Sequence, residues 1–297
     1  MKLIIKSVLL LSALFFIKNF CEKQTEGFTI TAISSNRSFD QKWATHSLSP
    51  PEESEFQRAL EQPYLYYDTG GQSFVFLSED GNYAIKFFKQ RYFHIPQWLH
   101  FVPAPLLQKY KTKKARGRVE KLKRDFTSYK IAFDEMQEET GIVYLHLNKT
   151  TNLNKKLTIK DPLDIEHRID LDEFDFVIQK RAELAYAYIN RIMLQGNVKE
   201  AKKAITNIIE LIIGYSQKGC YDRDPNIRTN CGMLDNKPIL IDVGKLIKDE
   251  EMKTREKINE VLLEICQPFN AWLQRTHPVL AVYLEEELLK QLDAHEE

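Results

Sequence analysis

Residues 219–244 constrain the fold of this chain more than any other segment, and they have the sequence GCYDRDPNIRTNCGMLDNKPILIDVG. Short apolar runs alternate here with turn residues, which predicts a strand, a turn and a second strand. Asp222 and Asp224 come first, Asn230 follows, and Asp242 closes the last apolar run. Each carboxylate alone would also fit a solvated turn. Their joint order indicates a site for a divalent cation beside a transferable phosphate, because such cations prefer oxygen ligands.

The composition is that of a globular protein of one large or two small domains. The chain has 297 residues, 43% of them hydrophobic, and 42 basic residues balance 42 acidic ones. Zero net charge argues against a nucleic-acid partner, because phosphate backbones are bound by an excess of lysine and arginine. The four cysteines and seven histidines show neither CxxC nor HExxH spacing, so a zinc hydrolase is not supported. Cys220 and Cys231 are either two buried thiols or, in an oxidising compartment, a disulfide.

Residues 1–20 are predicted to be a signal peptide or a membrane anchor. Lys2 and Lys6 precede or border the apolar run of residues 7–17. Residues 18–23 offer no small-residue cleavage site, which favours an uncleaved anchor. The excess of positive charge before the run favours export of the main domain. The protein is therefore expected to be membrane-anchored or exported, with the side of the membrane left open.

A polar linker is predicted for residues 21–55, and a first group of strands after it. A short helix is expected at residues 56–61, and alternating patterns predict three antiparallel strands. These strands are expected at residues 64–68, 74–77 and 83–88, with an Asp80-Gly81 hairpin between the last two.

Lys86 stands in the third strand, which is otherwise apolar. If its side chain points inward, it needs an anionic partner, because burying an unpaired ammonium group costs several kcal/mol. A lysine on an edge strand that reaches solvent would fit equally well. Gly70 and Gly71, in the turn before the second strand, would let backbone amides approach an anion, although an ordinary hairpin turn also explains them.

The following segments predict more strands and then helices. Residues 91–110 are aromatic and rich in proline, which indicates an inserted loop that packs on the domain, covers the site or lies on a membrane. A helix is predicted at 112–139, with Asp125 and, less closely, Glu120 bordering its apolar stripe as partners for Lys86. Further elements follow in this order: strands at 142–147, 156–160, 165–171 and 174–179, helices at 184–193 and 198–215, and two last helices, one that ends before Pro268 and one that begins after Pro278. Two lobes with the acidic loop at their seam are the expected packing.

In this order of parts the chain resembles the protein-kinase-like superfamily over most of residues 64–244. Ala84-Ile85-Lys86 resembles the strand whose lysine holds ATP phosphates, and Gln179-Lys180-Arg181-Ala182 occupies the place of the interlobe hinge. The resemblance implies that Gly70, Gly71, Lys86, Asp125 and Gln179 contact the nucleotide. The strings LNKT, QKRA and DRDP also resemble those of a set of chlamydial proteins without an assigned function.

The acidic loop matches the catalytic part of the same superfamily. Asp222-Arg223-Asp224 resembles the catalytic HRD triplet, and Asp242-Val243-Gly244 resembles the metal-binding DFG motif. The resemblance implies ATP and Mg²⁺ as cofactors, with Asn230 and Asp242 as metal ligands. Asp224 would orient or deprotonate the attacking hydroxyl, and Asp222 would support the loop or take over that role.

The resemblance implies an α+β fold of the bilobal kinase type. Its parts would be the N-terminal hydrophobic segment 1–20, the linker 21–55, an antiparallel β N-lobe at 56–180 and a reduced α-helical C-lobe at 181–297. The sequence departs from the pattern where Ser73 replaces a third glycine, and where Asn230 lies six positions after Asp224 instead of five. Only residues 245–297 follow Gly244, which makes a protein substrate less expected.

Two functions follow from this reading. The first is an atypical phosphotransferase that uses ATP and Mg²⁺ on an unknown hydroxyl substrate. The alternative is a membrane-tethered pseudokinase that binds a protein partner without catalysis, favoured by the export signal. A weaker third hypothesis is a metal-dependent hydrolase built on Asp222, Asp224 and Asp242. The nucleotide, an unknown substrate or partner, and the membrane contacted through residues 1–20 are the expected ligands.

Overall fold

The computed structural model describes residues 2–35, 37–90 and 105–293 and has a mixed α+β fold, as predicted. The chain divides into two compact units. The first comprises Met1–Leu122 and His146–Ile178, and the second comprises Lys123–Leu145 and Gln179–Glu297. The predicted inserted loop at 91–110 lies outside the described residues up to residue 104.

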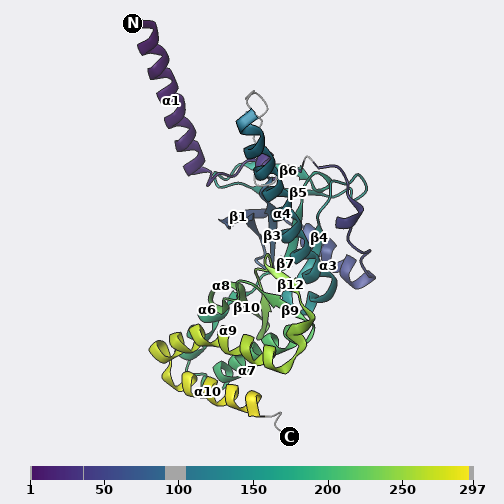
Figure 1. Ribbon diagram of the computed structural model, residues 1–297, viewed down its shortest axis with the longest axis vertical. Coiled ribbons are helices and arrows are strands. Elements are labelled where there is room, and N and C mark those ends of the chain that lie inside the picture. Colours follow the sequence, from purple (N-terminus) through teal and green to yellow (C-terminus); the bar gives the residue numbers. More distant parts are fainter. Residues whose placement is uncertain (1, 36, 91–104, 294–297) are drawn as a thin grey trace. The chain divides into compact units, whose positions relative to one another are not determined.

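The first part of the chain begins with helices and continues with groups of strands and helices (Figure 1). In order they are α1 (Lys2–Gln24), α2 (Ile30–Ile33), η1 (Gln41–Trp43), α3 (Pro50–Leu60), β1 (Tyr64–Thr69), β2 (Ser73–Ser78), β3 (Tyr83–Phe88), α4 (Pro105–Glu135), α5 (Gln137–Thr140), β4 (Ile142–His146), β5 (Lys156–Lys160), β6 (Glu166–Asp170), η4 (Leu171–Glu173) and β7 (Phe176–Lys180).

Helices dominate the second part. Its elements are β8 (Glu183–Leu184), α6 (Ala185–Leu194), α7 (Val198–Gln217), β9 (Cys220–Asp222), α8 (Ile227–Asn230), β10 (Cys231–Leu234), β11 (Lys237–Leu240), β12 (Leu246–Lys248), η5 (Glu250–Lys253), α9 (Arg255–Thr276) and α10 (Pro278–Asp293).

Helix α1 is apolar along its length and exposed. Within the described part of the chain it is the one helix long and apolar enough to cross a membrane, with a mean hydropathy of 1.8 over its apolar window. A signal sequence has the same length and composition. The predicted N-terminal hydrophobic segment is therefore present as a helix that runs on to Gln24.

A seven-stranded sheet organises the first unit, in the order β4-β7-β3-β2-β1-β5-β6. The predicted hairpins are confirmed, since β1 pairs with β2 and β2 with β3 in antiparallel fashion. Gly81 takes a positive φ of 73° in the turn between β2 and β3. Burial alone would raise the pKa of Asp80 beside it, but hydrogen bonds from Asn82, Ser78 and Gln62 lower that pKa to about 2.

The expectation of a purely antiparallel sheet is wrong at one strand pair. Strand β5 runs parallel to β1, with Tyr64 opposite Ile159. A parallel neighbour requires a long crossover connection, and here helix α4 and strand β4 intervene between β1 and β5. The sheet is therefore mixed rather than antiparallel.

Aromatic side chains fill the core of the first unit. Phe28 lies 5.3 Å from both Phe74 and Phe76 between ring centroids, and Phe76 lies 5.8 Å from Phe87. The rings meet edge to face, the geometry that their quadrupoles favour. Each of these side chains is at most 2% exposed, so this cluster contributes strongly to the stability of the sheet.

The segment predicted as a linker packs against this core. Phe28, Ile33 and Trp43 are buried, and the backbone of Ser34 bridges that of Phe174. Helix α3 begins within the same segment, where Ser49 and Glu52 form a capping box. The polar composition of residues 21–55 concealed these few buried anchors, so much of the segment is part of the folded unit.

Arg37 in this segment pairs with a buried acid of the sheet. Its Nη2 lies 2.7 Å from Oδ2 of Asp175, which is fully buried and also accepts a hydrogen bond from Gln90. Burial raises the pKa of Asp175, and the charge of Arg37 opposes this rise. The pair connects positions 138 residues apart and fixes the N-terminal segment to the unit.

His146 at the end of β4 is buried with both ring nitrogens engaged. Nδ1 lies 2.8 Å from the Phe174 carbonyl oxygen and Nε2 lies 3.0 Å from Oγ1 of Thr150. Burial lowers the pKa of His146, the largest effect, against the raising effect of the Phe174 hydrogen bond and of Asp175 and Asp172. The folded protein therefore holds this imidazole neutral more strongly than the unfolded chain does.

We expect this histidine to make stability fall in acid. Below pH ~6.5 the unfolded chain binds a proton that the folded protein resists, so stability is lost as the pH falls. Between pH 7.5 and 5.5 the contribution of His146 should amount to about 1 kcal/mol, since one pKa unit corresponds to ~1.4 kcal/mol. Urea unfolding of the wild type and of His146→Gln at both pH values measures it, with exposed His46→Gln as the control. Equal pH dependence in all three proteins would contradict the assignment.

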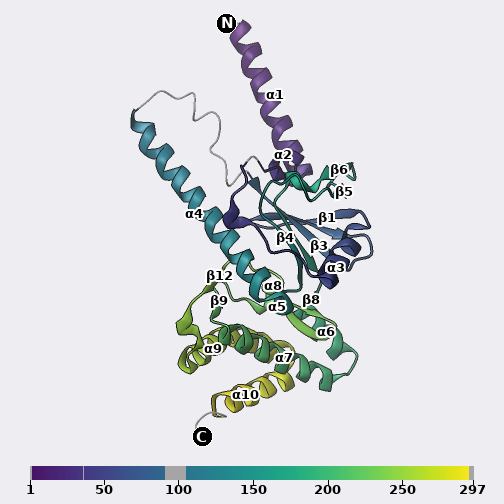
Figure 2. The ribbon, with the colours of Figure 1, turned by 90° about the vertical axis from the view of Figure 1, so that its right-hand side faces the viewer.

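Helices α7, α9 and α10 pack against one another in the second unit (Figure 2). The helix predicted at 198–215 is confirmed as α7, and its apolar residues Ala201, Ile205, Ile208 and Ile212 are buried. Helix α9 continues through Pro268, where a break was expected. A proline inside a helix removes one hydrogen bond, and the buried neighbours Cys266 and Phe269 hold the helix together on either side. Cys220 and Cys231 are buried free thiols.

Candidate functional site

The acidic loop is shaped by two pairs of short strands in the second unit. Strand β9 pairs antiparallel with β12, which places Asp222 opposite Leu246. Strands β10 and β11 form a hairpin through Asp235 and Asn236, whose φ angles of 48° and 64° suit its two-residue turn. Ile241 donates its amide hydrogen to the Asn230 carbonyl oxygen at 2.8 Å. The hairpin therefore brings Asn230 back beside the segment that leads to Asp242.

A glycine lets the strands of this hairpin approach closely. A Cβ atom at Gly232 would lie 2.7 Å from Cβ of Ala182 and 3.1 Å from Cγ2 of Ile241. No side chain fits at the first distance, so β8, β10 and the segment after β11 pack as tightly as they do only with glycine here. This close packing fixes the backbone on both sides of Asn230 and Asp242.

Asp222 is the buried carboxylate of the site. It is 3% exposed, and one carboxylate oxygen accepts the Asp224 amide hydrogen at 3.0 Å. Burial raises the pKa of Asp222 to about 6; the charge of Asp242 adds to the rise, while hydrogen bonds from Asp224 and the Asn230 side chain oppose it. A carboxyl group with such a pKa changes its protonation state near neutral pH, as general acids and bases do.

Asn230 holds the loop in place through its side chain. Nδ2 donates to the Asp224 carbonyl oxygen at 2.7 Å, and Oδ1 accepts from Oγ1 of Thr229 at 2.8 Å. The longer step from Asp224 to Asn230 is absorbed by the helical turn α8, which the Asn226 side chain caps. The extra residue therefore leaves Asn230 in contact with the backbone of Asp224.

Asp224 is exposed and pairs with Lys245, a residue that the sequence interpretation overlooked. Nζ of Lys245 lies 2.6 Å from Oδ2 of Asp224. The hydrogen bond that Lys245 donates to Asp224 is the largest effect on the pKa of Lys245 and raises it, and the charges of Asp224, Asp242 and Asp222 raise it further. Lys245 therefore contacts Asp224 directly, and the charges of Asp242 and Asp222 act on it from a greater distance. Its position directly after Asp242-Val243-Gly244 was the available signal.

Asp242 is exposed at the end of its strand. Oδ1 accepts the amide hydrogen of Gly244 at 3.1 Å, and within the described residues Oδ2 makes no hydrogen bond. Helix α4 reaches the same place, since Oγ of Ser128 donates to the Leu246 carbonyl oxygen at 2.6 Å. Tyr129 on α4 is fully buried; burial raises its pKa most, and the charges of Asp242 and Asp125 raise it further.

The two candidate partners of Lys86 differ sharply in burial. Asp125 is completely buried, and its Oδ1 accepts hydrogen bonds from Nε and Nη2 of Arg124 at 3.1 and 2.9 Å. Glu120 is exposed. Of the two, only Asp125 lies in the interior of the protein.

Gln179 is used inside the second unit. Its Nε2 donates to the carbonyl oxygens of Thr140 and Leu240 at 2.6 and 2.9 Å. The side chain therefore ties β7 to α5 and β11.

The remaining predicted nucleotide residues belong to the first unit. Lys86 is the one partly exposed residue of the otherwise buried strand β3. Gly70 donates its amide hydrogen to the Ser73 carbonyl oxygen at 3.0 Å, and its own carbonyl oxygen accepts from Nζ of Lys89. A Cβ atom at Gly71 would meet nothing within 4 Å. Lys89, buried at 4% exposure and overlooked in the sequence, braces this turn.

The residues suited to a metal ion are oxygen donors only. Among the residues that the structure describes, no three histidine, cysteine or acidic side chains converge as a complete metal site. Asp242 and Asn230 offer a carboxylate and an amide oxygen, a set that fits Mg²⁺, which keeps waters and substrate phosphates as its other ligands. The ammonium group of Lys245, paired with Asp224 at 2.6 Å, shows that a positive charge is held at this loop.

Comparison with known proteins gives remote likenesses. No family model matches the chain, and no curated protein matches it in sequence. A structure of the bifunctional kinase-methyltransferase WbdD is 13% identical with a TM-score of 0.35, covering 74% of this chain and 42% of WbdD. A co-crystal structure of WbdD with the kinase inhibitor LY294002 has a TM-score of 0.33 at 13% identity, covering 76% and 45%. The chain thus spans less than half the length of the WbdD chains.

A third similar structure is that of Rv3197 in complex with erythromycin, from Mycobacterium tuberculosis. It is 10% identical with a TM-score of 0.32, and the match covers 95% of this chain and 74% of that one.

Proposed function

We propose that the protein is an atypical, kinase-like phosphotransferase that uses ATP and Mg²⁺ to phosphorylate a hydroxyl group. One observation carries the proposal: Nζ of Lys245 lies 2.6 Å from Oδ2 of Asp224, in the loop that also carries Asp222 and Asp242, the other carboxylates that the motif pattern selects. Phosphoryl transfer is catalysed mainly by positioning and by stabilising negative charge, and a cation held among carboxylates supplies both. The bilobal arrangement is part of this proposal.

Each residue then has a distinct role. Asn230 and Asp242 would hold Mg²⁺, which would neutralise charge on the transferring phosphate. Asp224 is exposed and carries its carboxylate at the surface, so it would orient the attacking hydroxyl and accept its proton. Lys86 would hold phosphates, with Gly70 and Gly71 offering backbone amides. Asp222, buried beneath the loop, would keep the Asp224 backbone in place through the hydrogen bond at 3.0 Å.

The test is magnesium-dependent release of phosphate from ATP by the full-length protein. Asp242→Ala should lower the single-turnover rate at least ~100-fold, since it removes a metal ligand that stabilises charge in the transition state. Exposed Asp134→Ala, which breaks an i,i+4 pair with Lys130, is the matched control and should leave the rate unchanged. An unchanged rate in Asp242→Ala, or no turnover in the wild type, would rule out the phosphotransferase.

A second function, a membrane-tethered pseudokinase, is favoured by the same ion pair. Lys245 already supplies a cation at the acidic loop, and a degenerate site would keep this arrangement without binding magnesium. Thermal unfolding with Mg²⁺ and ATP separates the two functions. A midpoint raised by Mg²⁺-ATP in the wild type and not in Asp242→Ala supports nucleotide binding; its absence, together with no turnover, supports the pseudokinase.

A further inference from the structure

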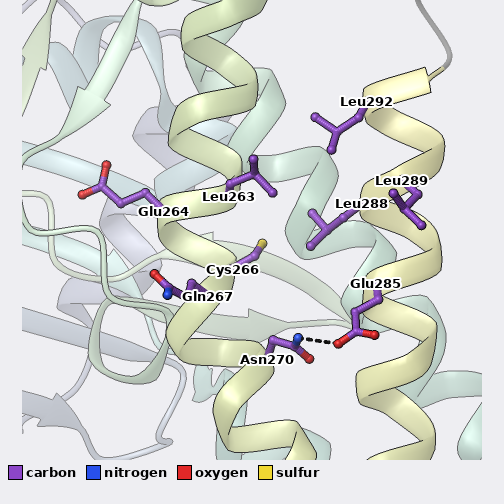
Figure 3. Close-up of a pocket in the computed structure, with 9 residues that line it drawn as sticks. All are labelled: Leu263, Glu264, Cys266, Gln267, Asn270, Glu285, Leu288, Leu289 and Leu292. Atoms are coloured by element: carbon purple, nitrogen blue, oxygen red, sulfur yellow. Dashed lines mark hydrogen bonds between the residues drawn. The ribbon is translucent and has the colours of Figure 1, made fainter.

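Helices α9 and α10 enclose a groove of about 600 Å³ in the second unit (Figure 3). The helices form an antiparallel pair joined at His277, because Asn270 contacts Glu285 and Nη2 of Arg255 donates to the Leu292 carbonyl oxygen. Four leucines line the groove: Leu263, Leu288, Leu289 and Leu292. The volume is sufficient for several anchoring side chains of a bound ligand.

Two of these leucines are open to solvent. Leu263 is 46% exposed and Leu289 is 58% exposed, and they stand on different helices. A single exposed leucine needs no explanation, but leucines that gather from two helices around one groove indicate a surface covered by a partner. None of the four predicted carboxylate and amide residues of the acidic loop lines this groove, so it is separate from the proposed phosphotransfer site.

The polar lining of the groove is acidic. Glu264 and Glu285 contribute carboxylates, and Oε1 of Glu285 accepts from Nδ2 of Asn270 at 2.8 Å. Within the described residues Oδ1 of Asn270 is buried without a hydrogen-bond partner. Residues 255–293 contain seven acidic and four basic residues. The charge around the groove is therefore suited to a basic ligand.

We propose that this groove binds a basic amphipathic helix of a protein partner. Apolar side chains spaced i, i+3 or i+4, and i+7 on that helix would enter between the leucines, as in helix-in-groove recognition. Lysine or arginine on its flanks would pair with Glu264 and Glu285. A second copy of the same face would bring acidic residues together, and an anionic lipid surface would be repelled. Charge complementarity therefore selects a basic protein segment.

The experiment uses the full chain in nanodiscs of zwitterionic phosphatidylcholine, with empty nanodiscs as the reference. The probe is a labelled synthetic peptide of about 18 residues, long enough to be helical, with leucines at helical spacing and lysine and arginine on its flanks. A companion peptide carries glutamate at every basic position. Fluorescence anisotropy should show the basic peptide binding at least ~10-fold more tightly, with the difference shrinking at high salt.

Variants of the groove provide the matched comparison. Leu289→Ser and Glu264→Gln should each weaken binding of the basic peptide, the first about 10-fold through lost apolar contact. Val282→Ser, on the same helix and 56% exposed but outside the groove, should leave binding unchanged. Glu264 is exposed, so its variant keeps the test informative if Leu289→Ser unfolds.

Three results would overturn the proposal. They are equal binding of the basic and acidic peptides, no binding of the basic peptide, and an effect of Val282→Ser as large as that of Leu289→Ser. Sedimentation that shows a dimer dissolved by Leu289→Ser would assign the groove to a second copy instead. All of these measurements are independent of ATP turnover, so a failed phosphotransferase would leave the groove proposal standing.

Discussion

Arg37→Ala should lower the free energy of unfolding by about 3–5 kcal/mol, because it leaves the carboxylate of Asp175 buried without its cation. Asp175 is fully buried, whereas the Arg37 side chain is 22% exposed. The guanidinium lies 2.7 Å from Asp175 and also donates to the Leu147 carbonyl oxygen at 3.4 Å. Truncation therefore removes the main opposing charge and a backbone contact in the same step.

The pH dependence identifies the cause of this loss. Burial raises the pKa of Asp175, and Arg37 lowers it, so removing Arg37 raises it further. A carboxyl group whose pKa is raised in the folded state lowers the stability of the protein as the pH rises through that pKa. It has no effect at low pH, where the group is protonated in both the folded and the unfolded state. The deficit of Arg37→Ala should therefore be largest at pH 7–8 and shrink in acid.

Urea unfolding of the single and double variants measures this effect. The double variant Arg37→Met, Asp175→Leu should recover most of the stability, because apolar residues of similar volume can replace a buried ion pair. Arg58→Ala is the control: Arg58 is 63% exposed and pairs with Glu55 at 3.1 Å, so its loss should change stability by less than ~1 kcal/mol. A similar loss in both arginine variants would mean that burial of the partner is not the cause.

Asp224→Asn should lower the rate of phosphoryl transfer by about 10²–10⁴-fold, the usual contribution of a general base. This result rests on the proposed function. Asparagine keeps the size of the side chain and, through Oδ1, a contact with Lys245, so nucleotide binding should persist. Single-turnover rates and Mg²⁺-ATP thermal shifts on the same samples separate loss of chemistry from loss of binding.

Asp222→Asn is the matched comparison, with its main effect on stability. Burial raises the pKa of Asp222 to about 6 in the folded protein, against ~4 in the unfolded chain. Asp222 therefore lowers the stability of the folded protein progressively as the pH rises from ~4 to 6. In metal-free buffer the variant should gain up to about 3 kcal/mol at pH 7.5 and nothing near pH 4. If Asp222→Asn abolished turnover while Asp224→Asn did not, the base would be Asp222.

The sequence was sufficient where local patterns decide structure. Asp80-Gly81 predicted a hairpin because glycine takes a positive φ there, and the alternation around Lys86 predicted strand β3. Helix α7 was predicted from an equally local pattern, the helical spacing of its apolar residues. The acidic loop was found because turn residues separate its short apolar runs, and the structure places Asp222, Asp224, Asn230 and Asp242 in one unit.

Contacts between distant positions could not be predicted in this way. Nothing near Arg37 indicates Asp175 as its partner, and a polar composition gave no warning that Phe28 and Trp43 are buried. The parallel pairing of β5 with β1 depends on a crossover through α4 rather than on a local turn. Lys245 was overlooked for another reason, since a lysine after a glycine at the surface is ordinarily solvated.

The ion pair of Lys245 with Asp224 means that a cation binding at the acidic loop would have to replace a positive charge that is already there. The ammonium group of Lys245 offsets part of the negative charge of the loop before any external cation arrives, because it pairs with Asp224 at 2.6 Å. A divalent cation that entered would displace the ammonium group rather than fill a bare negative pocket. The released lysine would then be free to meet the phosphate that accompanies the metal, so that arrival of the cation and capture of the anion become a single exchange.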